Sequence, residues 1–213
     1  MLTAWARTVQ MVLLEPARAY RSVRVGNDLD HFWFALVTGS VFWALNQLIQ
    51  RLLAGPTNEM MQRFAERMGA SGNPMLAKVF EQQRQLSSPA WTIAMLLLTP
   101  LVVAIFLYLN AGVTHLFALV FRQSKRGFPA TFAACAYAHA PLILLAIPGC
   151  GGFIAVIWMV VLIAIGLKET HQIRAGGATA TVLAPYLIFC CACGGLFVLM
   201  VMAGMQAGLA GTR

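Results

Sequence analysis

Residues 128–167 contain no Asp, Glu, Lys or Arg, and Pro148 and Gly149 interrupt this run near its middle. An α-helix rises about 1.5 Å per residue, so about 20 apolar residues cross a hydrocarbon core of about 30 Å. The run is twice that length, which predicts two membrane crossings joined by a tight hairpin. Because lipid offers no hydrogen-bond partner to an open backbone amide, each crossing is expected to be helical.

The composition agrees with a membrane protein. Of the 213 residues, 60% are hydrophobic and only 10% are charged, whereas soluble domains carry about 25% charged residues. The net charge is +8. In a soluble chain that excess would suggest nucleic acid, but here the basic residues are expected beside lipid head groups. We therefore predict membrane lipids, and no nucleic acid, as partners.

Four long segments lack charged residues, and together they predict five crossings. They are residues 31–50, 85–121, 128–167 and 175–212, the third of which divides at Pro148. The second is read as one long helix that starts near Pro89, with Pro100 as a site for a kink. The predicted fold is an all-α bundle of five transmembrane helices over residues 31–213, with an external loop at about 52–88.

The distribution of Lys and Arg predicts the orientation. An odd number of spans places the N-terminal tail and the loops at about 122–127 and 168–174 on one side. That side carries nine basic residues: Arg7, Arg18, Arg21, Arg24, Arg122, Lys125, Arg126, Lys168 and Arg174. The other side carries six: Arg51, Arg63, Arg67, Lys78, Arg84 and Arg213. Basic loops stay in the cytoplasm, so the N-terminus is expected inside and the C-terminus outside.

Two segments outside the spans have helical patterns. Residues 1–30 form a cytoplasmic segment in which Trp5, Val9, Val12 and Leu13 share one helix face. This predicts an amphipathic helix over residues 2–14 on the inner membrane surface. In the external loop, Asn73 precedes a second helical pattern, which is expected to be a surface helix.

Several residues from the third span onward resemble one family of membrane proteins. The residues that carry the resemblance are Tyr137, Pro141, Pro148, Gly149, Trp158 and Gly166. They resemble the membrane domain of the Yip family, the Ypt/Rab-interacting proteins, and most of all its bacterial branch. The resemblance implies five spans, a cytoplasmic N-terminus and a short external C-terminus in a bacterial inner membrane.

The segment before the first span departs from the eukaryotic pattern. Eukaryotic members have an Asp-Leu-Tyr-Gly-Pro-type motif there, whereas Asp28 and Leu29 are followed here by Asp30 and His31. The binding of prenylated small GTPases, which those relatives perform, is therefore not carried over to this chain.

No charged side chain is predicted inside a span, which disfavours a proton-coupled mechanism. Six polar residues remain there: Asn46, Gln47, Asn110, His115, Tyr137 and His139. If they faced a common groove, they would line a polar path for a transporter, a channel or a lipid scramblase. If they satisfied one another in a dry core, a binding or organising role would be favoured.

Three residues allow a metal hypothesis. His115, Cys135 and His139 lie at similar depth on two helices joined by a short loop, and imidazole and thiolate ligands suit zinc or copper. The alternative is that each His forms a hydrogen bond across helices and that Cys135 packs as a small hydrophobe. Because no fourth ligand is evident, we predict no metal and no cofactor.

The last span contains Gly204 and Gly208 in a G-x-x-x-G pattern, which suits either a homodimer face or packing within one bundle. No metalloprotease, nucleophile-elbow or P-loop motif occurs in the sequence. The sequence therefore predicts a non-enzymatic integral membrane protein. Its expected role is to organise or bind partners or lipids at the cytoplasmic membrane.

Overall fold

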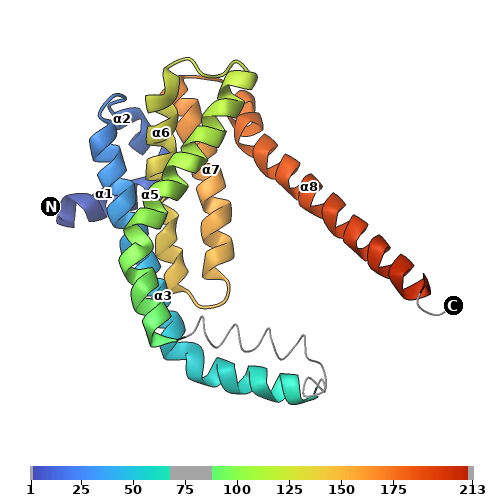
Figure 1. Cartoon of the computed structure of the whole chain (residues 1–213). Helices are drawn as coiled ribbons and strands as arrows, with labels where there is room; N and C mark the ends of the chain where they lie inside the picture. The colour runs from blue at the N-terminus through green and yellow to red at the C-terminus, as the bar shows by residue number, and fades with distance from the viewer. Residues whose placement is uncertain (1, 68–87, 211–213) are drawn as a thin grey trace.

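The computed structural model describes residues 2–67 and 88–210, and all regular secondary structure in these ranges is helical (Figure 1). The elements are α1 (Leu2–Leu14), α2 (Pro16–Ser22), α3 (Asp28–Arg67), α5 (Pro89–Val120), α6 (Gly127–Tyr137), the 3-10 helix η2 (Ala140–Ala146), α7 (Gly151–His171) and α8 (Ala175–Ala210). Five segments among these residues are long and apolar enough to cross a membrane: Asp28–Leu52, Pro89–Val120, Gly127–Ala146, Gly151–His171 and Ala175–Gly195. This confirms the predicted all-α bundle of five spans.

The third span lies at the centre of the bundle. Its helix α6 is rich in alanine, and Ala130, Ala133, Ala134 and Ala136 are fully buried. Because alanine is small, α3, α5 and α7 can approach the backbone of α6 closely. In this span 61% of the most apolar window is buried, against 33% or less in each of the others. The other spans therefore pack around the third.

The third span is not one continuous α-helix. Helix α6 ends at Tyr137, and the chain continues as the 3-10 helix η2. Pro141 explains the break, because proline has no N–H to donate to the carbonyl of Tyr137 four residues earlier. Tighter hydrogen bonds follow instead, from His139 N to Ala136 O at 3.3 Å and from Leu142 N to His139 O at 3.0 Å.

The hairpin between the third and fourth spans lies at Pro148 and Gly149, as predicted. Gly149 has a φ of +83°, which L side chains rarely adopt. A Cβ on Gly151 would lie 1.9 Å from the carbonyl oxygen of Leu144. Both glycines are therefore needed for the chain to reverse within so few residues.

The first span is longer than the predicted residues 31–50. Helix α3 begins at Asp28 and continues to Arg67, so the segment predicted as an external loop begins as a helix. The helix predicted after Asn73 lies outside the described residues. Helix α5 starts at Pro89 as predicted, because the hydroxyl of Ser88 accepts a hydrogen bond from the backbone N–H of Trp91 at 3.2 Å.

Helix α1 has the predicted length and packs on the bundle. Its Trp5 Nε1 donates to the hydroxyl of Thr38 at 2.9 Å, and Val9 and Val12 are buried. Thr38 lies roughly 15 Å along α3 from its first residue, at 1.5 Å per residue. The apolar face that we expected on the membrane surface therefore covers α3, because Trp5 finds a hydrogen-bond partner there.

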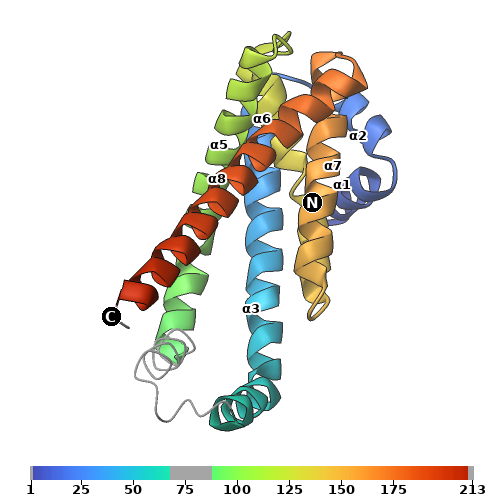
Figure 2. The same ribbon diagram turned by 90° about the vertical axis from the view of Figure 1, so that its right-hand side faces the viewer.

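Helix α8 diverges from the other spans (Figure 1). Near its start Ala178, Thr181 and Val182 are buried, whereas Leu187 and Phe189 are exposed. In the turned view α8 runs obliquely past α5 rather than along it (Figure 2). Most of the last span therefore presents its side chains to the surroundings of the bundle.

Candidate functional site

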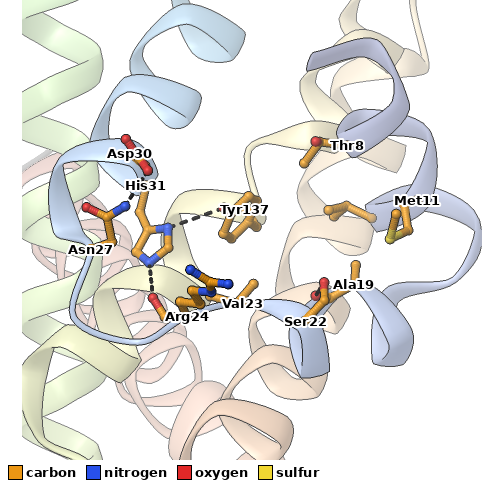
Figure 3. A pocket seen from close by; sticks show the side chains of 11 residues that line it. Thr8, Met11, Ala19, Ser22, Val23, Arg24, Asn27, Asp30, His31 and Tyr137 are labelled. Atoms are coloured by element: carbon orange, nitrogen blue, oxygen red, sulfur yellow. Dashed lines mark hydrogen bonds between the residues drawn. The ribbon is translucent and has the colours of Figure 1, made fainter. Parts of the chain in front are cut away.

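A pocket of about 330 Å³ lies between the N-terminal segment and the start of α3. Figure 3 shows its lining side chains, which come from α1, α2, the loop that follows them, α3 and the end of α6. They are Thr8, Met11, Val12, Ala19, Ser22, Val23, Arg24, Asn27, Asp30, His31 and Tyr137. Hydroxyl, amide, charged and aliphatic groups meet here, so the pocket suits an amphipathic ligand rather than a wholly apolar one.

A hydrogen-bonded pair of side chains, His31 and Tyr137, lines one side of the pocket (Figure 3). His31 Nε2 lies 3.1 Å from the carbonyl oxygen of Arg24, and its Nδ1 lies 3.2 Å from the Tyr137 hydroxyl. A carbonyl only accepts, so Nε2 carries a proton and donates it to Arg24 O, and the Tyr137 hydroxyl is the partner of Nδ1. Both nitrogens of His31 therefore have partners within the described residues.

Two charged residues of opposite sign line the pocket. The carboxylate of Asp30 accepts a hydrogen bond from the side-chain amide of Asn27. The guanidinium of Arg24 forms no hydrogen bond or ion pair with any residue that the structure describes. Among the described residues, the pocket therefore offers the unpaired guanidinium of Arg24 and the carboxylate of Asp30, which has remaining acceptor capacity.

Helix α2 fixes the position of the N-terminal segment. The Tyr20 hydroxyl donates to the carbonyl oxygen of Ala134 at 3.1 Å, and burial raises the pKa of Tyr20 well above its ordinary value. Arg21 Nε lies 2.9 Å from a carboxylate oxygen of Glu169. A Cβ on Gly166 would lie 3.0 Å from the Tyr20 ring. These contacts hold one wall of the pocket on α6 and α7.

The other side of α1 forms an apolar groove of about 350 Å³. It is lined by Trp5, Ala6, Val9, Gln10, Leu13, Leu14, Phe42 and Ile143. Trp5 and Phe42 are in ring contact, with centroids 5.8 Å apart. The groove suits hydrocarbon, so α1 separates a mixed pocket from an apolar one.

His115 belongs to a hydrogen-bonded chain that links three spans. Its Nδ1 lies 2.9 Å from the hydroxyl of Thr131, which lies 2.9 Å from His171 Nε2. The backbone N–H of Arg126 donates to His171 Nδ1 at 3.2 Å. His171 therefore carries a proton on Nε2 and donates it to the Thr131 hydroxyl, which is also the partner of His115 Nδ1. The chain ties α5 and α6 to the end of α7.

His139 has a hydrogen-bond partner in its own span. Its Nδ1 lies 3.0 Å from the carbonyl oxygen of Cys135, one turn earlier. No group of three or more His, Cys, Asp or Glu side chains in the described residues is arranged to hold a metal ion. The metal hypothesis for His115, Cys135 and His139 therefore has no support from the described residues.

The six predicted polar residues differ in their hydrogen bonding within the described part of the chain. His115, Tyr137 and His139 lie in three separate hydrogen-bonded groups. Asn46, Gln47 and Asn110 are half-buried, and their side chains form no hydrogen bond within the described part of the chain. No hydrogen bond in the described residues joins two of these six side chains.

The residues of the family resemblance shape the backbone. Pro141 breaks the third span, and Pro148 and Gly149 form the hairpin. Trp158 is partly buried and packs against the core. Gly166 allows α7 to approach α6 closely, because a Cβ added at Gly166 would lie only 2.9 Å from the Cβ of Ala134. The surroundings of Gly204 and Gly208 lie outside what the structure describes.

Sequence reasoning missed several partners of the predicted residues. His31 and Tyr137 are 106 positions apart, and Thr131 and His171 are 40 apart. The available signal was that His31 stands at the start of the first predicted span and His171 in the short loop after the fourth, where histidine can find partners on neighbouring helices. Which partners they find depends on helix rotation, which an apolar run does not define.

Comparison with known protein families gives one match over most of the chain. A family model described as the Yip1 domain matches residues 11–202. No curated protein and no solved structure matches the chain.

Proposed function

Because this chain belongs to the Yip1-domain family, we propose that it is a non-enzymatic integral membrane protein that binds lipids or protein partners through its N-terminal face. The observation that carries this proposal is the pocket between α1, α2 and the start of α3. Tyr20 and Trp5 hold its walls on the bundle with hydrogen bonds to Ala134 and Thr38. A pocket built in this way can recognise a ligand without further ordering of the chain.

The charge distribution supports a location at the cytoplasmic membrane. Four arginines lie in the N-terminal segment: Arg7, Arg18, Arg21 and Arg24. Basic residues near a span favour the cytoplasmic side and are attracted to anionic lipids. The proposed setting is a bacterial inner membrane, with the N-terminus inside and the C-terminus outside. Association of two copies through Gly204 and Gly208 is part of the same proposal.

A site-specific photo-crosslinker tests the binding face. We would place benzoyl-phenylalanine at Met11, which lines the pocket, and as a control at Leu101, which is exposed on α5. The expected result in native membranes is a saturable adduct of a distinct lipid or protein at Met11 and an unselective mixture of bulk lipids at Leu101. The same adducts at both positions would contradict a binding site at the N-terminal face.

A transport function is the second candidate, and one observation favours it. The side chains of Asn46, Gln47 and Asn110 are half-buried without a hydrogen bond in the described residues, and polar residues inside a membrane often mark a pathway. Lipid flip-flop and ion leak in liposomes test it. Flux that the Asn110→Ala, His139→Ala double variant loses would favour a transporter, channel or scramblase over the binding role.

A further inference from the structure

The pocket at the N-terminal face is lined by one basic and one acidic side chain, which come from different segments of the chain. Arg24 lies in the loop after α2, and Asp30 lies in the first turn of α3 (Figure 3). They form no ion pair with each other, although both are exposed. Within the described residues, the lining therefore offers a cationic donor on one element of its wall and a carboxylate acceptor on another.

The pocket lies at one end of the first candidate span. The first candidate span begins at Asp28, so Asn27 and Asp30 lie where the hydrocarbon region begins. On the opposite wall, Met11, Val12 and Val23 provide aliphatic surface. The His31 nitrogens are already occupied by Tyr137 and by the carbonyl of Arg24. A ligand would therefore be recognised mainly by the two charged side chains.

We propose that this pocket binds the head group of a phospholipid that has a primary amine, such as phosphatidylethanolamine. The phosphate lies on the guanidinium of Arg24, and the ammonium lies on the carboxylate of Asp30. The glycerol and the first methylenes lie against Met11 and Val12. This inference rests on the proposed function and names the ligand class of that site.

The charges of the pocket discriminate among lipid classes. An anionic head group without an amine leaves Asp30 unpaired and is repelled by it. A quaternary ammonium has no N–H to donate to Asp30, whereas a primary ammonium has three. The volume of about 330 Å³ accommodates a head group but not two acyl chains. The chains would therefore extend into the surrounding bilayer.

Native mass spectrometry of the full chain in detergent tests the proposal. The probes are dioleoyl-phosphatidylethanolamine, dioleoyl-phosphatidylcholine and dioleoyl-phosphatidylglycerol at equal concentration. The expected result is one retained phosphatidylethanolamine per chain, in preference to the other two lipids. Arg24→Gln should lower its affinity about tenfold, since a hydrogen bond to a charged group is lost. Asp30→Asn should reduce phosphatidylethanolamine to the level of phosphatidylcholine.

Arg7→Gln is the matched control, because Arg7 is exposed on α1 and does not line the pocket. The carbonyl of Arg24 that holds His31 belongs to the backbone, so Arg24→Gln retains that bond. Equal retention by Arg24→Gln and Arg7→Gln, or a preference for phosphatidylglycerol, would overturn the proposal. Soluble phosphoethanolamine is the competitor: displacement at equal concentration would identify a free metabolite as ligand and overturn the lipid assignment.

The two proposals fail in different ways. A saturable adduct from the crosslinker at Met11, together with no preference for phosphatidylethanolamine, would leave the N-terminal binding face standing and remove the head-group assignment. Absence of any specific adduct at Met11 would remove the binding face itself.

Discussion

At the scale of single residues, Thr131 is notable because its hydroxyl is the hydrogen-bond partner of two histidines. Its hydroxyl is fully buried and lies 2.9 Å from both His115 Nδ1 and His171 Nε2. The hydroxyl can accept from one histidine while it donates to the other. No apolar residue of the same size can do either, so this one oxygen satisfies two imidazole nitrogens from different spans.

Replacing Thr131 with valine tests this role. Thr131→Val keeps the shape and removes the partner of both imidazole nitrogens. His115 is only half-buried, whereas His171 is fully buried, and one unsatisfied buried group costs about 1–3 kcal/mol. We expect the free energy of unfolding in detergent micelles to fall by about 2 kcal/mol. The matched control is Thr181→Val, because the Thr181 hydroxyl bonds only to Gly177 O in its own helix. An equal effect of both substitutions would show that the linked histidines contribute no stability.

At the scale of elements, the helices approach one another closely at a few positions with small side chains. One such contact lies among α2, α6 and α7. A Cβ on Gly166 would lie 2.9 Å from the Ala134 Cβ and 3.0 Å from the Tyr20 ring. Backbone approach of this kind is how membrane helices gain packing energy without a hydrophobic driving force between them.

Gly166→Ala is therefore expected to separate α2 and α7 from α6. Overpacking of a dense core destabilises by about 1–3 kcal/mol, and the same change should weaken the hydrogen bond from Tyr20 to Ala134 O. Gly112→Ala on α5 is the control, because nothing lies within 4 Å of an added Cβ there. Limited proteolysis measures the effect: the N-terminal segment should be cleaved faster in Gly166→Ala than in Gly112→Ala. Equal protection of the two variants would contradict a tight three-helix contact.

At the scale of the whole molecule, the N-terminal segment makes the bundle asymmetric. Helices α1 and α2 cover α3, η2 and α7 on one side, whereas α8 diverges on the other (Figure 1). Arg21 and Glu169 join the start of the chain to the end of the fourth span, with the closest N–O distance at 2.9 Å. One side of the bundle is therefore covered by protein, and the other is left to α8 and its surroundings.

The orientation of the molecule has a direct test in a native thiol. Cys150 is exposed in the hairpin between the third and fourth spans, and Cys135 is fully buried. A hairpin outside the cell would be reached by a membrane-impermeant maleimide in intact spheroplasts, and Cys150→Ser should abolish this labelling. In that background, Ala175→Cys, at the start of α8, should react only after permeabilisation. The reverse pattern would place the N-terminus outside.

The sequence by itself determined the number of spans, the hairpin at Pro148 and Gly149, the N-terminal helix and the family. These follow from local quantities: the length of an apolar run, the backbone freedom of glycine and the spacing of apolar residues. The break at Pro141 also had a local cause, the missing N–H of proline.

Only the tertiary structure decided which polar groups meet. The pairs His31–Tyr137 and Trp5–Thr38 join residues that are 106 and 33 positions apart. Their contact depends on how far each helix is rotated and translated against its neighbours. In a bundle whose helices are apolar on all sides, the hydrophobic pattern leaves that rotation undefined, and close packing of small residues together with a few hydrogen bonds defines it. For this reason the five spans were predictable, whereas the pocket at the N-terminal face was not.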